Sequence, residues 1–143
     1  MKIINRKANY QYKLESERFE AGITLSGGEV KAVRSGRGDI SQSYAKVLNG
    51  EIYLINANIP VLGAKALPTR TRKLLLHKDE ILSIITKAKQ QKLTLIPTKL
   101  YTKGRLIKAE LALGKSKKKF EKRESIKKKD IERQIEQEFR IKI

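Results

Sequence analysis

The chain lacks several residue types on which whole classes of protein depend. It has no cysteine, no tryptophan and a single histidine among 143 residues. Without cysteine it can form neither disulfides nor thiolate metal sites, and we expect no metal and no cofactor. No uninterrupted apolar run approaches a membrane span, and residues 1–6 lack the apolar core of a signal peptide. These absences exclude a transmembrane protein and predict a cytoplasmic location.

Acidic residues are also scarce. Lysine and arginine number 33 against 15 aspartates and glutamates, which gives a net charge of +18 and a pI near 10.2. A charge of this size predicts a polyanionic partner, and both nucleic acid and an anionic membrane surface satisfy it. The length suits one domain with a modest core and a tail.

Hydrophobic periodicity predicts that the first quarter of the chain forms strands. Tyr10, Tyr12 and Leu14 alternate with polar residues, which is the period-two pattern of a half-buried strand. Residues 19–25 repeat the pattern. Their alternation places Glu20, a carboxylate, on the outer face of a very basic protein.

Two hairpins are expected further along the chain. Asn49-Gly50 is a strong turn signal between the two halves of residues 43–55. Lys103-Gly104 divides residues 93–113 in the same way. In the second hairpin the alternation places Lys108 on the outward face.

Short helices separate these strands. Ser26 followed by Glu29 is a capping box, and Gly36 stands where a helix ends. His77 falls at the N-cap of a second helix, with acidic residues in its first turn. About six short strands with two or three short helices fit a closed barrel better than an open sheet. We therefore expect a mainly β, partly open antiparallel barrel of the oligonucleotide-binding (OB) type, a class that commonly binds oligonucleotides.

The most basic stretch of the barrel precedes His77. Arg70, Arg72 and Lys73, with Thr71 among them, suit phosphate oxygens, because guanidinium groups bind them bidentately and hydroxyls add hydrogen bonds. Three leucines follow at once and suit a core. We expect Arg70, Arg72 and Lys73 to be exposed RNA contacts at the edge of the domain. An ordinary solvated loop that enters a helix is the alternative.

The composition changes at Lys115. From Lys115 to Ile143 there are 12 basic and 6 acidic residues, too polar a segment to build a core. We expect a barrel over residues 1–114 and a basic tail over residues 115–143 that is disordered when free. Ile131, Ile135 and Phe139 recur at helical spacing, which predicts a helix that folds against a partner. A merely solubilising tail is the alternative, but it does not explain the apolar stripe.

Six stretches of the chain carry a resemblance to one known family. They are Asn5-Arg6-Lys7-Ala8, Phe19-Glu20-Ala21-Gly22-Ile23, Gly28-Glu29-Val30-Lys31, Ser43-Tyr44-Ala45, Asn56-Ala57-Asn58-Ile59 and, most specifically, Pro68 to Lys78. In these the chain resembles the SsrA-binding (small protein B) family of bacteria. The resemblance implies an OB-type barrel that binds the tRNA-like domain of transfer-messenger RNA (tmRNA). It also implies entry into stalled ribosomes, with elongation factor Tu delivering the charged RNA, for trans-translation and ribosome rescue.

The same resemblance implies a monomeric RNA-binding adaptor that catalyses no reaction, and it indicates which residues bind. RNA contacts of the family fall on Asn5, Glu20, Leu75 and Lys108. Carboxylates are poor phosphate partners, so Glu20 is expected to accept a hydrogen bond from a base amino group or a 2′-hydroxyl. The tail residues expected to contact the decoding centre of the ribosome are Phe120, Glu121, Lys122, Arg123, Ile131, Ile135 and Phe139.

Two other classes of function remain open on the residues alone. A structural ribosomal protein would be equally basic and equally tailed. An RNA-processing enzyme is disfavoured by the isolated histidine and by the lack of carboxylates at metal-site spacing. Asp79-Glu80 is better explained by the helix dipole.

Overall fold

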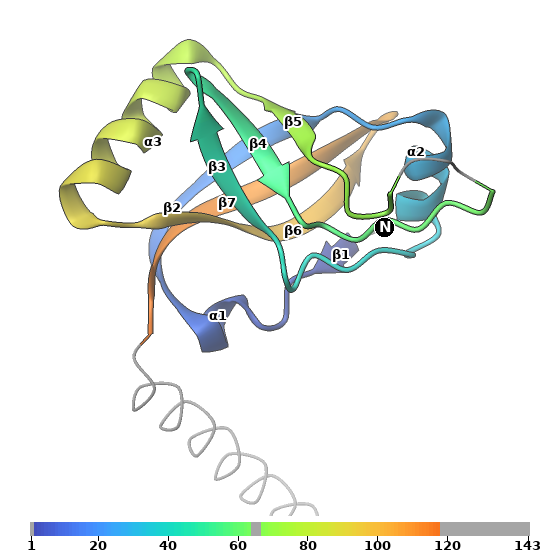
Figure 1. Cartoon of the computed structure of the whole chain (residues 1–143), viewed down its shortest axis with the longest axis horizontal. Coiled ribbons are helices and arrows are strands. Elements are labelled where there is room, and N and C mark those ends of the chain that lie inside the picture. Colours follow the sequence, from blue (N-terminus) through green and yellow to red (C-terminus); the bar gives the residue numbers. More distant parts are fainter. Residues whose placement is uncertain (1, 64–66, 118–143) are drawn as a thin grey trace, which may run out of the picture.

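The computed structural model describes residues 2–63 and 67–117, which form a small β-barrel with helices at its ends (Figure 1). Within this part of the chain the strands form one antiparallel sheet in the order β1-β6-β3-β4-β5-β2-β7, and β6 also pairs with β7, which closes a ring. The strands are β1 (Lys2–Ile4), β2 (Tyr12–Ile23), β3 (Tyr44–Leu48), β4 (Glu51–Ile55), β5 (Arg72–Leu75), β6 (Thr94–Lys103) and β7 (Leu106–Ser116). The helices are α1 (Ala8–Gln11), α2 (Gly27–Arg34) and α3 (Lys78–Gln91).

The ring is extensively paired on one side and narrowly paired on the other. β7 pairs along most of its length with both β2 and β6. By contrast, β3 meets β6 through the single residue pair Ala45 and Leu95. This arrangement confirms the predicted mainly β, OB-like antiparallel barrel with short helices.

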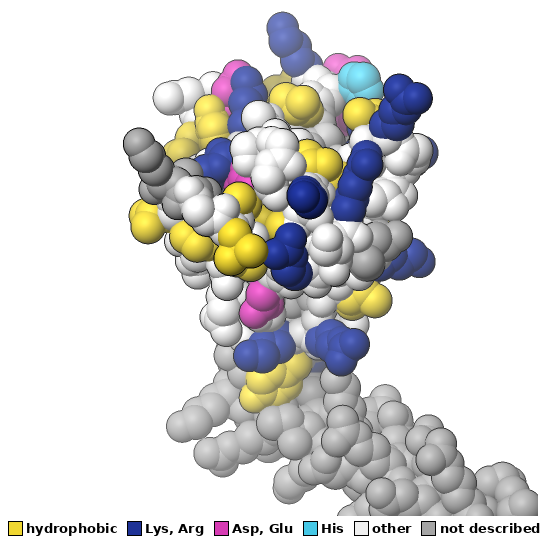
Figure 2. All heavy atoms as spheres, turned by 90° about the vertical axis from the view of Figure 1, so that its right-hand side faces the viewer, with side chains coloured by type: hydrophobic (Ala, Val, Ile, Leu, Met, Phe, Trp, Pro, Cys, Tyr) yellow, Lys and Arg dark blue, Asp and Glu magenta, His cyan; other side chains and the backbone are white. Residues whose placement is uncertain are grey.

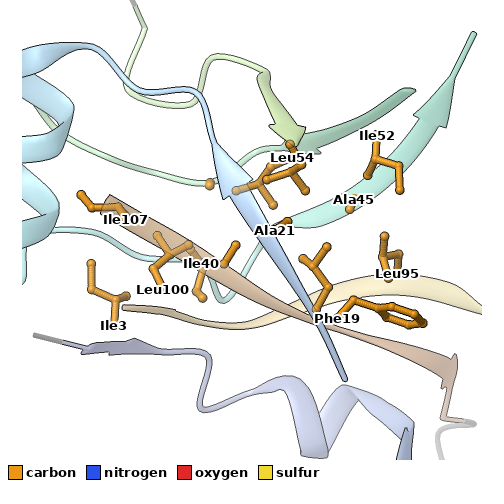
Figure 3. Packing of buried hydrophobic residues seen from close by; sticks show 14 of the residues in the cluster. Ile3, Phe19, Ala21, Ile40, Ala45, Ile52, Leu54, Leu95, Leu100 and Ile107 are labelled. Atoms are coloured by element: carbon orange, nitrogen blue, oxygen red, sulfur yellow. The ribbon is translucent and has the colours of Figure 1, made fainter. Parts of the chain in front are cut away.

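Inward-facing side chains of the strands fill the barrel. On β7 the predicted face, every second residue from Ile107 to Leu113, is at most 7 % exposed. Figure 3 shows side chains from β2, β4 and β6 converging with these in one cluster. The labelled members are Ile3, Phe19, Ala21, Ile40, Ala45, Ile52, Leu54, Leu95, Leu100 and Ile107.

Both predicted hairpins are confirmed. Asn49 and Gly50 have φ angles of 52° and 76°, as a two-residue type I′ turn between β3 and β4 requires. Gly104, with φ of 60°, turns the chain between β6 and β7. Asparagine and glycine tolerate these left-handed conformations at little steric cost.

The two longer helices begin where the sequence predicts. The Ser26 hydroxyl accepts a hydrogen bond from the Glu29 amide at 3.3 Å, and the Glu29 carboxylate accepts one from the Ser26 amide at 2.9 Å. At the start of α3 the His77 amide donates to the Glu80 carboxylate at 3.4 Å. No helix in the described residues is long and apolar enough to span a membrane.

The first strands differ from the expectation. Tyr10 lies in α1, and β2 runs on from Tyr12 to Ile23 where two strands were expected. Its register against β7 shifts between Leu14 and Arg18. Such a bulge inserts extra residues into one strand without ending it. The polar residues between Leu14 and Arg18 therefore do not divide β2 into two strands.

The far end of β7 crosses the expected boundary between barrel and tail. Lys115 pairs with Lys13 and Ser116 with Tyr12, so the strand continues two residues past position 114. The change of composition at Lys115 therefore falls inside a strand. The tail residues named above, from Phe120 to Phe139, lie outside the described residues.

A buried ion pair joins α2 to β5. Arg72 has no exposed surface and Glu29 is 4 % exposed. The Arg72 guanidinium donates from Nε to Glu29 Oε2 at 2.7 Å, and its other nitrogens donate to the carbonyls of Ala57 and Pro68, each at 2.8 Å. The charge is therefore both paired and fully hydrogen-bonded, as a buried charge must be.

Arg70 binds the other oxygen of the same carboxylate. Its Nε donates to Glu29 Oε1 at 3.2 Å, and about a third of its side chain is exposed. Burial raises the pKa of Glu29, but the hydrogen bonds from Arg70, the Ser26 amide and Arg72 together lower it from 4.5 to about 2. Glu29 is thus ionised, and it holds the segment that leads into β5 through its hydrogen bonds with Arg70 and Arg72.

The expectation that Arg72 is an exposed phosphate ligand is wrong. Residues alternate along β5, so that Arg72 and Leu74 face inward while Lys73 and Leu75 face outward. The Arg72 guanidinium has no surface in contact with solvent at which to meet a phosphate. Its role is to stabilise the fold.

Arg72→Ala and Lys73→Ala should therefore have very different effects. Removing Arg72 leaves the Glu29 carboxylate buried beside a void, which should cost about 3–5 kcal/mol of unfolding free energy. Lys73 forms an exposed ion pair with Glu51, which solvent screens, so its removal should leave the unfolding free energy nearly unchanged. Urea denaturation measures both. Equal, small losses would show that Glu29 does not depend on Arg72.

The low pKa of Glu29 also predicts a specific loss of stability in acid. Because the pKa is lower in the folded than in the unfolded state, the carboxylate stabilises the fold fully above its unfolded value and loses this effect as the pH falls from about 4.5 to about 2. The unfolding free energy lost over this interval should approach about 3 kcal/mol. Glu29→Gln, although less stable at neutral pH, should lose less stability over that interval. Parallel curves of stability against pH would contradict the assignment.

Candidate nucleic-acid interface

A groove on the outside of the barrel gathers residues from β2, β5, β7 and the start of α3. Its volume is about 460 Å³. Three of the residues predicted to bind RNA, Glu20, Leu75 and Lys108, line it together although they lie far apart in the sequence. The other lining residues are Gly22, Leu76, His77 and Glu80.

Glu20 is held in a defined position at one side of this groove. The Tyr101 hydroxyl donates a hydrogen bond to its Oε2, and Lys103 Nζ lies 3.3 Å from its Oε1. These two hydrogen bonds lower the pKa of Glu20. Burial and the hydrogen bond to Glu20 raise the pKa of Tyr101 to about 12. Glu20 is therefore an ionised acceptor with a fixed orientation.

The floor of the groove depends on Gly22. Gly22 pairs with Leu75 on β5 and with Lys108 on β7. A Cβ at position 22 would lie 3.3 Å from the Leu75 Cβ, a tight contact. Because Gly22 has no side chain, there is space above β2 at this position. Leu75, which is 56 % exposed, gives this space an apolar wall.

The groove continues past these residues into a second hollow of about 300 Å³ toward the turn between β6 and β7. Gly22, Leu75 and Lys108 line both hollows. Arg105 adds a cation to the second one, and its remaining lining is apolar. One continuous surface therefore offers a carboxylate, lysine and arginine cations and exposed apolar side chains.

The other predicted RNA contacts do not line this groove. Lys73 faces outward on β5 and its Nζ lies 3.0 Å from Glu51 Oε1. Asn5 is buried, and its Nδ2 donates to the Pro97 carbonyl at 2.9 Å. Its Oδ1 has no hydrogen-bond partner among the described residues. Arg70 is partly exposed but lies in the ion-pair cluster around Glu29.

The sequence did not reveal the residues that complete the groove. Gly22 appeared as a strand residue and His77 as a helix cap, with Glu80 explained by the helix dipole. Tyr101 was expected only as one residue of the second hairpin, and nothing in the sequence linked it to Glu20. Only the pairing of β2 and β6 on either side of β7 brings these groups together.

Basic side chains cover the surface around the α2 end of the barrel. Figure 2 shows many lysines and arginines on this face and few acidic side chains among them. Such a distribution attracts a polyanion to this face. In residues 2–63 and 67–117, no three histidine, aspartate or glutamate side chains are placed to hold a metal ion.

Comparisons with known proteins agree on one family. The family described as SmpB protein matches residues 2–141. An SsrA-binding protein of Burkholderia vietnamiensis is 49% identical over 137 residues, which cover 92% of this chain and 92% of the relative. One from Thermosipho africanus is 48% identical over 142 residues, covering 94% and 95%. One from Dehalococcoides mccartyi is 43% identical, covering 96% and 82%.

A solved structure is similar over the same region. It is described as "tmRNA-SmpB: a journey to the center of the bacterial ribosome", and its chain is 41% identical with a TM-score of 0.68. The match covers 82% of this chain and 85% of the solved one. Sequence, fold and the arrangement of the barrel thus lead to the same conclusion: the chain belongs to the SmpB family, the SsrA-binding proteins.

Proposed function

We propose that the protein binds the tRNA-like domain of tmRNA through the groove between β2, β5, β7 and α3. The observation that carries this proposal is the convergence of Glu20, Leu75 and Lys108 on one groove. These are positions at which the family contacts RNA, and the fold brings them together from three different strands. Membership of the SsrA-binding family supports the identity of the RNA.

The groups in the groove suit a shaped, partly unpaired RNA. Lys108 provides a point charge for a phosphate, and Leu75 provides an apolar contact for a ribose or a base face. Glu20 repels phosphates, so its place in the groove requires a donor, either a base amino group or a 2′-hydroxyl. A ribosomal protein that only clamps phosphates has no use for such a carboxylate, which favours the adaptor.

The barrel and the tail have separate tasks in this proposal. The barrel holds the RNA, while residues 118–143 act on the stalled ribosome together with the charged RNA that elongation factor Tu delivers. The protein then works as a monomer by binding, without catalysis, in trans-translation and ribosome rescue. That work places it in the cytoplasm.

Glu20→Ala tests the groove. It should weaken binding of the tRNA-like domain about tenfold, because one discriminating hydrogen bond to RNA is lost. Non-specific binding to an unrelated RNA should stay equal or tighten, because the net charge rises. Filter binding at one fixed salt concentration measures both, and sequencing of the co-purified RNA should show tmRNA with the parent protein and less with the variant.

Glu17→Ala is the matched control. Glu17 also lies on β2, is similarly exposed and pairs with Lys87, but it does not line the groove. It changes the net charge by the same amount and should leave specific binding unchanged. Tighter binding of the tRNA-like domain by Glu20→Ala would remove Glu20 from the site.

Truncation tests the division between barrel and tail. The cut should follow Lys117, because β7 extends to Ser116 and an earlier cut would remove paired residues. The truncated protein should keep the stability of the barrel and most of its affinity for free RNA, yet lose rescue of stalled ribosomes in a reconstituted assay. The substitutions Ile135→Asp and Phe139→Asp, made together, should reproduce the loss without removing a cation. Full rescue by the truncated protein would disprove the role of the tail.

A further inference from the structure

A second outward face of the barrel carries aromatic and cationic side chains in register. On β3, β4 and β5, Lys46 lies directly opposite Tyr53, and Tyr53 directly opposite Lys73. Residues directly opposite one another in neighbouring strands point to the same side of the sheet. The three side chains therefore form a row across three strands, a phenol between two ammonium groups.

This row is accessible to a partner. Lys46 is exposed and Lys73 is 41 % exposed at its side chain. Tyr44, two residues before Lys46 on β3, adds a second ring that is 39 % exposed. β3 and β4 lie in front of β2 and β7 in Figure 1, and no helix of the described chain passes in front of them.

A single carboxylate orients the row. Glu51 accepts a hydrogen bond from the Tyr53 hydroxyl at 2.9 Å and binds the Lys73 ammonium at 3.0 Å. The hydrogen bonds from Lys73 and Tyr53 lower the pKa of Glu51, and the hydrogen bond to Glu51 raises the pKa of Lys73. Glu51 thus fixes the Tyr53 ring and neutralises one of its two flanking cations.

The row adjoins the groove through β5. Lys73 and Leu75 are two residues apart on this strand and both face outward. Leu75 is part of the groove, whereas Lys73 is part of the row. An RNA chain that occupies the groove can therefore pass along β5 onto the row without crossing the barrel.

We propose that the row Lys46–Tyr53–Lys73, with Tyr44, binds an unpaired stretch of the same RNA that occupies the groove. This proposal rests on the function proposed above. Bases stack on aromatic rings whatever their sequence, and flanking lysines bind the phosphates between them. OB-type barrels bind oligonucleotides on the outer face of neighbouring strands. A basic row on a chain of net charge +18 favours RNA over a protein partner.

Substitutions at Tyr53 test the stacking. The probe is a labelled oligouridylate of about eight nucleotides, a length within the range of single OB barrels, followed by fluorescence anisotropy. Tyr53→Leu should weaken its binding roughly tenfold, whereas Tyr53→Phe, which keeps the ring, should bind within about twofold of the parent. Because the chain has no tryptophan, Tyr53→Trp provides a single fluorophore that stacked bases should quench. A ring that remains unquenched at saturation would overturn the stacking.

Glu51→Gln tests the electrostatics, with Glu17→Gln as its matched control. Both glutamates pair with a lysine, and the exposed side-chain fractions are closely similar, 41%/46% for Lys73–Glu51 and 41%/48% for Lys87–Glu17. Both variants raise the net charge equally. Glu51→Gln should tighten oligouridylate binding several-fold because it frees Lys73, and Glu17→Gln should not. If both variants tighten oligouridylate binding equally, the row contributes only general electrostatic attraction, and the proposal is overturned.

Binding of the tRNA-like domain of tmRNA decides whether the row and the groove share one RNA. Tyr53→Leu should weaken this binding as well as that of the oligouridylate. If Tyr53→Leu weakens binding of the oligouridylate alone, the assignment of the row to the same RNA is overturned. If it weakens binding of neither RNA, the row does not bind RNA, and a protein becomes the partner to test for this face. If Glu20→Ala weakens specific binding while Tyr53→Leu does not, the proposed function stands and this inference fails.

Discussion

The ion pair between Glu29 and Arg72 is the interaction on which the rest of the barrel depends. It ties the first turn of α2 to the first residue of β5, and the remaining donors of Arg72 bind the carbonyls of Ala57 and Pro68, which both lie in the connection between β4 and β5. A buried charge persists only when it is paired and hydrogen-bonded, so these groups have little freedom to rearrange. The start of β5 is therefore fixed from inside the barrel by polar contacts, whereas most of the core is apolar.

Fixing β5 determines what its outward residues can do. Because Arg72 and Leu74 face the interior, Lys73 and Leu75 must face solvent on the same side. Leu75 then meets Gly22 of β2 at the groove, and Lys73 meets Tyr53 of β4 in the aromatic row. A buried salt bridge with no access to RNA thus positions both surfaces proposed to bind it. In the proposed mode of binding, the basic stretch before α3 therefore acts partly through Arg72, which is buried and cannot touch the RNA.

Much of the fold could be predicted from local patterns. The hairpin at Asn49-Gly50 was predicted because few other dipeptides accept two left-handed residues in succession, and the α2 start because Ser26 and Glu29 satisfy each other's amides. β5 was missed because four residues with two cations resemble a loop as much as a strand. The break expected inside β2 was wrong, since a bulge absorbs polar residues without ending the pairing.

The sequence alone determined the polyanionic partner, the family and the alternation that turns Glu20 and Lys108 outward, because charge, motif and period-two patterning are local properties. Only the tertiary structure decided which outward residues share a surface. Glu20 and Lys108 meet because β2 pairs with β7, and Leu75 joins them because β5 pairs with β2. The structure alone also decided the role of Arg72. A cation on a strand faces inward or outward according to register, and a buried carboxylate of another element makes the inward position stable.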